Sequence, residues 1–110
     1  MQRTFTETTA FTKRWHDMGL TDDDLLELQR VLMRNPDIGD VIQGTGGARK
    51  LRFALPDTGK SGGARVIYVD IVVEEQTHLL LCYPKGKQDN LTEKQKKILK
   101  SYIATIKKGK

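Results

Sequence analysis

The residues of this chain that could do chemistry by their type and spacing are mostly basic, and they fall into two blocks. The first block, residues 48–65, contains five basic residues and one acidic residue. The basic residues are Arg49, Lys50, Arg52, Lys60 and Arg65. The second, residues 94–110, holds seven lysines and no acid, while the rest of the chain is mildly acidic and the net charge is +5. Such blocks suit a polyanion, nucleic acid above all, although a lysine-rich helix face can equally be a solvated surface.

Part of the first block is expected to form a cleft on one face of a sheet. Lys50 and Arg52 point to the same side of a strand because side chains alternate with a period of two. Arg65 begins the next apolar run, so an antiparallel hairpin would bring it opposite them. The exit of the following strand adds three residues that would border the same groove: Tyr83, Lys85 and Lys87. Gathered cations repel one another unless an anion joins them, which predicts an anion site, with plain solvation of the sheet face as the alternative.

Other kinds of site are not supported by the residue pattern. Residues 54–61 (ALPDTGKS) fit a relaxed phosphate-loop pattern, but two glycines and a strand follow where that motif requires a helix. The two histidines and one cysteine have no partners at metal-ligand spacing, and two serines do not assemble a hydrolase triad. Cys82 lies in an apolar run typical of a core residue. We therefore expect neither a metal nor an organic cofactor.

Three helices are predicted from apolar residues that recur at helical spacing. Residues 8–18 and 21–35 would form an N-terminal helical hairpin, the second helix beginning at a capping box of Thr21 and Asp24. A last helix follows the sheet. Its predicted buried stripe consists of Ile98, Leu99, Tyr102, Ile103 and Ile106.

The remaining elements are strands, and the 110 residues form one domain, residues 1–110. Strands are predicted over residues 2–6, 48–54, 65–73 and 78–83, with a hairpin at residues 74–77. The order β-α-α-β-β-β-α indicates an α+β fold, in which a small antiparallel meander packs against the helical hairpin and the C-terminal helix. With one cysteine, no secretory signal and no long apolar run, a cytoplasmic location is expected.

Three segments carry a resemblance to a known family. They are residues 40–52 (DVIQGTGGARKLR), 59–68 (GKSGGARVIY) and 81–85 (LCYPK). Together they resemble the RelE/ParE superfamily of bacterial toxins, and its HigB-like branch in particular. The succession of a helical hairpin, a Gly-rich link, a basic strand, a Gly-x-Arg strand and a last helix extends this resemblance over nearly the whole chain.

The resemblance implies a toxin of a type II toxin–antitoxin pair, most simply a metal-independent endoribonuclease that cuts messenger RNA on the ribosome. In that chemistry the RNA 2′-hydroxyl attacks the adjacent phosphodiester. By position, Lys50 and Arg52 match the family's paired basic strand residues. Arg65 matches the arginine of the Gly-x-Arg motif, and Lys85 lies in the basic turn after the next strand. Tyr83 is the phenol nearest to these residues in the pattern. Residues expected to help bind the RNA are Arg49, Lys60, Lys87, Lys100, Lys107 and Lys108.

The chain departs from the family pattern where the general base is expected. Gly86 stands where RelE has an arginine, and Thr92 where RelE has a tyrosine. Tyr83, Lys50 or Lys60 would then have to move the proton. Two alternatives stay open: a ParE-like inhibitor of DNA gyrase on the same fold, and a non-catalytic relative that only binds its partner. The expected partners are a small helix-turn-helix antitoxin of the HigA kind, the ribosome and mRNA.

Overall fold

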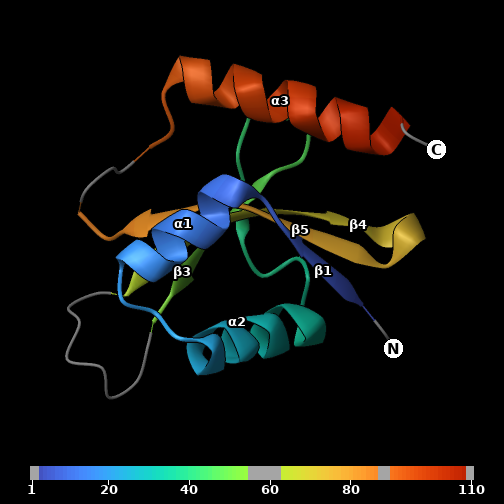
Figure 1. The fold of residues 1–110 in the computed structure, drawn as a ribbon. Helices are drawn as coiled ribbons and strands as arrows, with labels where there is room; N and C mark the ends of the chain where they lie inside the picture. Colours follow the sequence, from blue (N-terminus) through green and yellow to red (C-terminus); the bar gives the residue numbers. More distant parts are fainter. Residues whose placement is uncertain (1–2, 55–62, 87–89, 109–110) are drawn as a thin grey trace.

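The computed structural model describes residues 3–54, 63–86 and 90–108, and its element order matches the expected α+β fold with one strand more (Figure 1). The additional strand, Asp40–Val41, precedes the basic strand. The elements are β1 (Thr4–Glu7), α1 (Thr9–Asp17), α2 (Asp22–Arg34), β2 (Asp40–Val41), β3 (Arg49–Phe53), β4 (Ala64–Ile71), a 3-10 turn (Val72–Glu74), β5 (Gln76–Pro84) and α3 (Glu93–Lys108).

The strands form one mixed sheet in the order β1-β5-β4-β3-β2. The predicted antiparallel meander is confirmed for β3, β4 and β5. The first strand lies at the sheet edge as predicted, but it runs parallel to β5, from Thr4 opposite Gln76 to Glu7 opposite Leu79. A buried ion pair of 2.8 Å between Arg3 and Asp70 ties its start to β4.

The two N-terminal helices lie within the predicted ranges and are one residue shorter at each end. Thr8 caps α1 by accepting a hydrogen bond of 3.0 Å from the Phe11 amide, and Gly19 follows that helix with a φ of +75°. Thr21 and Asp24 form the predicted capping box at the start of α2. In Figure 1 the two helices run in opposite directions.

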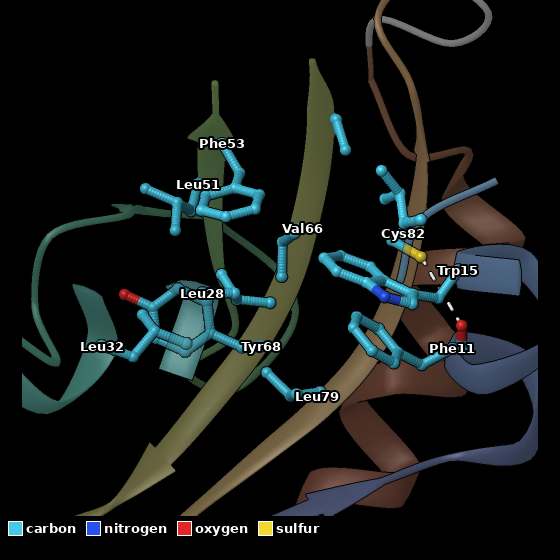
Figure 2. Close-up of a cluster of buried hydrophobic side chains, with 12 residues drawn as sticks. Phe11, Trp15, Leu28, Leu32, Leu51, Phe53, Val66, Tyr68, Leu79 and Cys82 are labelled. Atoms are coloured by element: carbon cyan, nitrogen blue, oxygen red, sulfur yellow. Dashed lines mark hydrogen bonds between the residues drawn. The ribbon is translucent and has the colours of Figure 1, made fainter. Parts of the chain in front are cut away.

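Both helices cover one face of the sheet with apolar side chains that recur at helical spacing (Figure 2). Trp15 stacks between Phe11 and Phe53, at ring-centroid distances of 5.4 and 6.2 Å. Figure 2 shows α1 beside β5 and α2 beside β3, with α3 behind the sheet. The core on this face also contains Leu28, Leu32, Leu51, Val66, Tyr68, Leu79 and Cys82.

Helix α3 covers the opposite face through a narrower stripe than predicted. Leu99 and Ile103 are buried there and Ile106 partly so, among strand residues such as Ile67 and Val69. Ile98 and Tyr102 remain 59% and 38% exposed, because only one line of the helix faces the sheet. None of the helices in the described ranges is both long and apolar enough to cross a membrane.

The β4–β5 connection corrects the predicted hairpin. The strand expected over residues 65–73 ends at Ile71, and Val72 and Val73 belong to the exposed 3-10 turn. Glu75 closes the connection with a φ of +53°, and β5 starts at Gln76, inside the predicted hairpin. The apolar, β-branched run therefore extends two residues beyond the end of the strand.

Candidate functional site

Three predicted site residues lie side by side on the three central strands, near one end of them. Arg52 of β3 is directly opposite Arg65 of β4, and Arg65 is directly opposite Tyr83 of β5. Directly paired residues point to the same face, and this is the face that α3 covers, because the alternate residue Val66 belongs to the core beneath α1 and α2. We call Arg52, Arg65 and Tyr83 the cross-strand row.

The charges of the cross-strand row are arranged for an anion. Arg52 is exposed and Arg65 half-buried, and like charges directly opposite each other on neighbouring strands are unfavourable. Among residues 3–54, 63–86 and 90–108, no carboxylate lies within ion-pair distance of either guanidinium. Two acids that could pair with Arg65, Asp57 and Asp89, lie outside the described residues. Two planar guanidinium groups side by side are suited to grip the oxygens of one phosphate.

Glycine and core packing position the cross-strand row. Gly63, two residues before Arg65, has a φ of +66°, and a Cβ atom there would overlap the carbonyl oxygen of Phe53. Only glycine permits this close approach of β3 and β4. Tyr83 is 1% exposed and packs in the core beneath α3 with Leu91. The row is therefore held by rigid strands rather than by loops.

Lys50 and Lys85 lie next to the cross-strand row. Lys50 points to the same face as Arg52, from two residues earlier on β3, and is half-buried. It is directly opposite Asp40 of β2, a pairing of opposite charges across the strands. Lys85 is exposed just after β5, where its amide donates to the carbonyl oxygen of Gly63 at 3.3 Å. The structure thus gathers the five predicted catalytic residues at one end of the sheet.

Arg49 lies apart from this group, on the face that α1 and α2 cover. Its guanidinium donates to the carbonyl oxygens of Asp37 and Gly39, at 3.2 and 2.8 Å, and forms a 3.6 Å ion pair with the Asp37 carboxylate. The Tyr68 hydroxyl accepts from the Gly39 amide and donates to the carbonyl oxygen of Pro36. These contacts hold the segment before β2, which indicates a structural role for Arg49.

The predicted RNA-binding lysines of α3 form a separate surface. Lys107 donates to the carbonyl oxygen of Gly46 at 3.1 Å, and the Lys100 side chain also lies close to Gly46. Lys108 is exposed near the end of the helix. Lys60 and Lys87, and most of the segment that resembles a phosphate loop, lie outside the described residues.

The buried titratable groups do not form a second reactive centre. Burial raises the pKa of the Cys82 thiol to about 12, so this residue is a core side chain, as predicted. Burial also lowers the pKa of His78, whose two ring nitrogens are buried and have no hydrogen-bond partner in the described ranges. His16 is exposed on α1. Within the described part of the chain, no three histidine, cysteine or acidic residues are grouped as metal ligands would be.

Two features of the site were missed from the sequence. Asp40 opposite Lys50 depends on β2, a strand too short to show a period. The role of Gly63 had a signal in the glycine pair at residues 62–63, but its close contact with Phe53 depends on how β3 and β4 meet.

Comparison with known proteins identifies a family and a fold. Residues 2–109 match the family described as the RelE toxin of the RelE/RelB toxin–antitoxin system. Among solved structures, the chain is similar to one in the crystal structure of the archaeal RelE–RelB complex from Pyrococcus horikoshii OT3. The identity is 24%, the match covers 80% of this chain and 100% of that chain, and the TM-score is 0.51.

Proposed function

Because the chain belongs to the RelE family of toxins from toxin–antitoxin systems, we propose that it is an endoribonuclease that cuts messenger RNA on the ribosome and so stops translation. The observation that carries this proposal is the direct pairing of Arg52 with Arg65 on one face of the sheet. Within the described residues neither arginine has an ion-pair partner. Two such cations in register cost folding free energy, and a phosphodiester would relieve that cost.

The reaction we assign to the site needs no group beyond the RNA and the side chains. The 2′-oxygen forms a bond to the neighbouring phosphorus while the bond from phosphorus to the 5′-oxygen breaks. A base takes the proton of the 2′-hydroxyl, and an acid gives a proton to the departing 5′-oxygen. The products are a 2′,3′-cyclic phosphate and a free 5′-hydroxyl.

The guanidinium groups of the cross-strand row would act on the negative charge that grows on phosphorus. Arg65, central in the row and half-buried, would hold two equatorial oxygens and remain charged throughout the accessible pH range. Arg52 would hold the same phosphate from the side of β3. Donors fixed in this way stabilise the transition state without reorganising during the reaction.

Proton transfer is assigned to the phenol of Tyr83, with Lys50 as the alternative. Tyr83 is the direct neighbour of Arg65, but its hydroxyl is buried, so the side chain would have to turn outward to reach the 2′-hydroxyl. Thr92, which occupies the position of the family's tyrosine, is instead engaged in a capping box with Gln95 at the start of α3. Its side chain serves the helix rather than the reaction.

The lysine surface of α3 would contribute attraction to ribosomal RNA rather than chemistry. Phosphate contacts of this kind orient a protein and make its binding depend on salt concentration. Lys107 is engaged with the carbonyl oxygen of Gly46, whereas Lys108 is exposed near the end of α3, and we expect Lys108 to make the more direct contribution.

A cognate antitoxin is proposed to neutralise the protein by covering the basic site with acidic or apolar segments. RelB accompanies RelE in the solved complex from Pyrococcus horikoshii. For this chain we propose a small helix-turn-helix partner of the HigA kind, encoded beside it.

Controlled expression in a bacterium tests the proposed function. Induction should stop growth, co-expression of the adjacent reading frame should restore it, and primer extension should find new 5′ ends within translated codons. Arg65→Ala should remove the arrest, while Arg30→Ala, an exposed arginine on α2 paired with Glu27 at 3.4 Å, should keep it. Arrest with a DNA-damage response and intact messages would favour the gyrase alternative. Normal growth with abundant folded protein would contradict toxin function.

A further inference from the structure

A groove runs along the edge of β5, between that strand and α1. Strand β1 pairs with β5 only as far as Leu79, and Thr8 then donates to the carbonyl oxygens of Leu79 and Leu80, at 3.1 and 2.7 Å. Beyond this point α1 replaces a strand as the neighbour of β5 (Figures 1 and 2). The groove has a volume of about 560 Å³ and is lined by Lys13, Arg14, Asp17, Met18, Cys82, Tyr83 and Pro84.

The groove is poorly suited to an added β-strand. Pro84 lines the groove and has no amide hydrogen to donate. A proline at a sheet edge hinders the addition of another strand for this reason. Helix α1 stands where the added strand would lie, close enough for the Cys82 thiol to contact the carbonyl oxygen of Phe11 at 3.6 Å. The occupant must therefore be recognised through side chains.

The side chains of the groove combine an apolar surface with one available cation. Met18 and Pro84 are both partly exposed. Lys13 and Asp17 neutralise each other through a 3.1 Å ion pair. Arg14 is exposed, and in the described part of the chain it has no carboxylate within ion-pair distance. Flat apolar surface beside an arginine suits a nucleotide, whose base and phosphate need those two environments.

The groove lies at the edge of β5, one strand away from Arg65, and the side chains of the cross-strand row point to the other face of the sheet. Tyr83 lines the groove and is also the direct neighbour of Arg65. Neighbouring strands lie about 4.8 Å apart, so the groove begins roughly 10 Å from β4, across β5. The side chains of the row point to the face that α3 covers, so an RNA strand with one phosphate on Arg65 would pass around the edge of β5 beyond Leu79 and bring a nearby nucleotide to α1.

We propose that this groove holds the nucleotide next to the cleaved phosphate, with Arg14 on its phosphate and Met18 and Pro84 against its base. The inference rests on the proposed nuclease function and deepens it. Arg14 is a positioning residue, because it would hold a flanking nucleotide and not the reacting atoms. The groove would then influence which sequences are cut, through the base that fits between α1 and β5.

The test is RNA binding by the full chain, measured separately from cleavage. The probe is a fluorescein-labelled uridine pentamer with 2′-O-methyl groups, which cannot be cleaved, titrated by anisotropy between 20 and 200 mM KCl. Arg14→Ala should weaken binding about fivefold at the lowest salt and reduce the salt slope by about 0.7, the loss of one single-strand phosphate contact. Arg30→Ala, an exposed arginine outside the groove, should leave both quantities unchanged. On programmed ribosomes Arg14→Ala should raise KM with kcat near the parent value.

The outcomes separate this inference from the nuclease proposal. If the parent chain cuts messages but Arg14→Ala matches it in affinity, salt slope and KM, the groove inference is wrong and the nuclease proposal stands. If Arg14→Ala weakens the binding of a hexaglutamate peptide but not the binding of the RNA pentamer, the groove binds an acidic protein segment and the inference is equally wrong. If the pentamer binds through Arg14 but the parent chain cuts nothing on ribosomes, the groove binds RNA and the nuclease proposal fails.

Discussion

Replacing Arg52 with glutamine should raise the stability of the free protein while it weakens the site. Arg52 and Arg65 are directly opposite each other, so their charged groups lie about 6 Å apart if the side chains extend in parallel. At that distance two unit charges repel by about 0.7 kcal/mol in water, and by about 0.4 kcal/mol once 0.1 M salt screens them. The water value applies because Arg52 is exposed. For a domain of this size the gain corresponds to a rise of about 2–4 °C in melting temperature.

Circular-dichroism melts at low and moderate ionic strength measure this effect. The advantage of Arg52→Gln should be largest in 10 mM buffer and shrink in 150 mM KCl. Added sulfate should raise the melting temperature of the parent more than that of the variant, because the dianion binds best where both guanidinium groups are present. Arg30→Gln is the matched control, since Arg30 is an exposed arginine with a favourable partner in Glu27, and its loss costs up to about 0.5 kcal/mol.

A lower melting temperature for Arg52→Gln in 10 mM buffer, similar to that of Arg30→Gln, would refute the reasoning. It would mean that Arg52 already has a favourable partner in the folded chain. Equal stabilisation of the parent and Arg52→Gln by sulfate would also refute it, because the anion would then not need both guanidinium groups.

Three further predictions concern the groups that hold the fold. Burial lowers the pKa of His78 below its ordinary 6.5, so as the pH falls from 6.5 the unfolded chain is protonated at this residue before the folded chain, and stability should decrease. His78→Leu should flatten that part of a plot of melting temperature against pH, whereas His16→Leu should not. Gly63→Ala should reduce the free energy of unfolding in urea by about 2 kcal/mol or more, because alanine resists the positive φ and its Cβ would meet the Phe53 carbonyl. Cys82, with a pKa of about 12, should resist iodoacetamide at pH 8 in the native protein and react rapidly in urea.

The local parts of the fold could be predicted because their signals lie within one element. Phe11 and Trp15 recur at helical spacing, and Thr21 with Asp24 marks a helix start whatever surrounds it. The alternation of Lys50 and Arg52 with apolar residues likewise identifies a half-buried strand. Such signals need no knowledge of the partner element.

Other features depend on residues far apart in the chain. The parallel pairing of β1 with β5 joins Thr4 to Gln76, and nothing in the four residues of β1 specifies that partner or direction. The exposure of Ile98 and Tyr102 depends on the width of the sheet surface that α3 meets, although their spacing alone suits a buried stripe.

The site was partly predictable for the same reason. An antiparallel connection between neighbouring strands is the simplest topology, and it places Arg65 opposite the basic strand. The groove beside α1 was not predictable, because Arg14 and Pro84 belong to elements that meet only in the folded chain.

The most direct test of the central claim, that the cross-strand row cleaves RNA, is single-turnover cleavage on ribosomes programmed with a defined message. The parent chain should cut the message and leave a 2′,3′-cyclic phosphate, and a message with a 2′-deoxynucleotide at the cut position should stay intact. Arg65→Ala, with an unchanged melt, should cut at least about a hundredfold more slowly, as expected for the loss of one fixed donor to the transition state. Cleavage by Arg65→Ala at the parent rate, or cleavage of the 2′-deoxy message, would contradict the assignment.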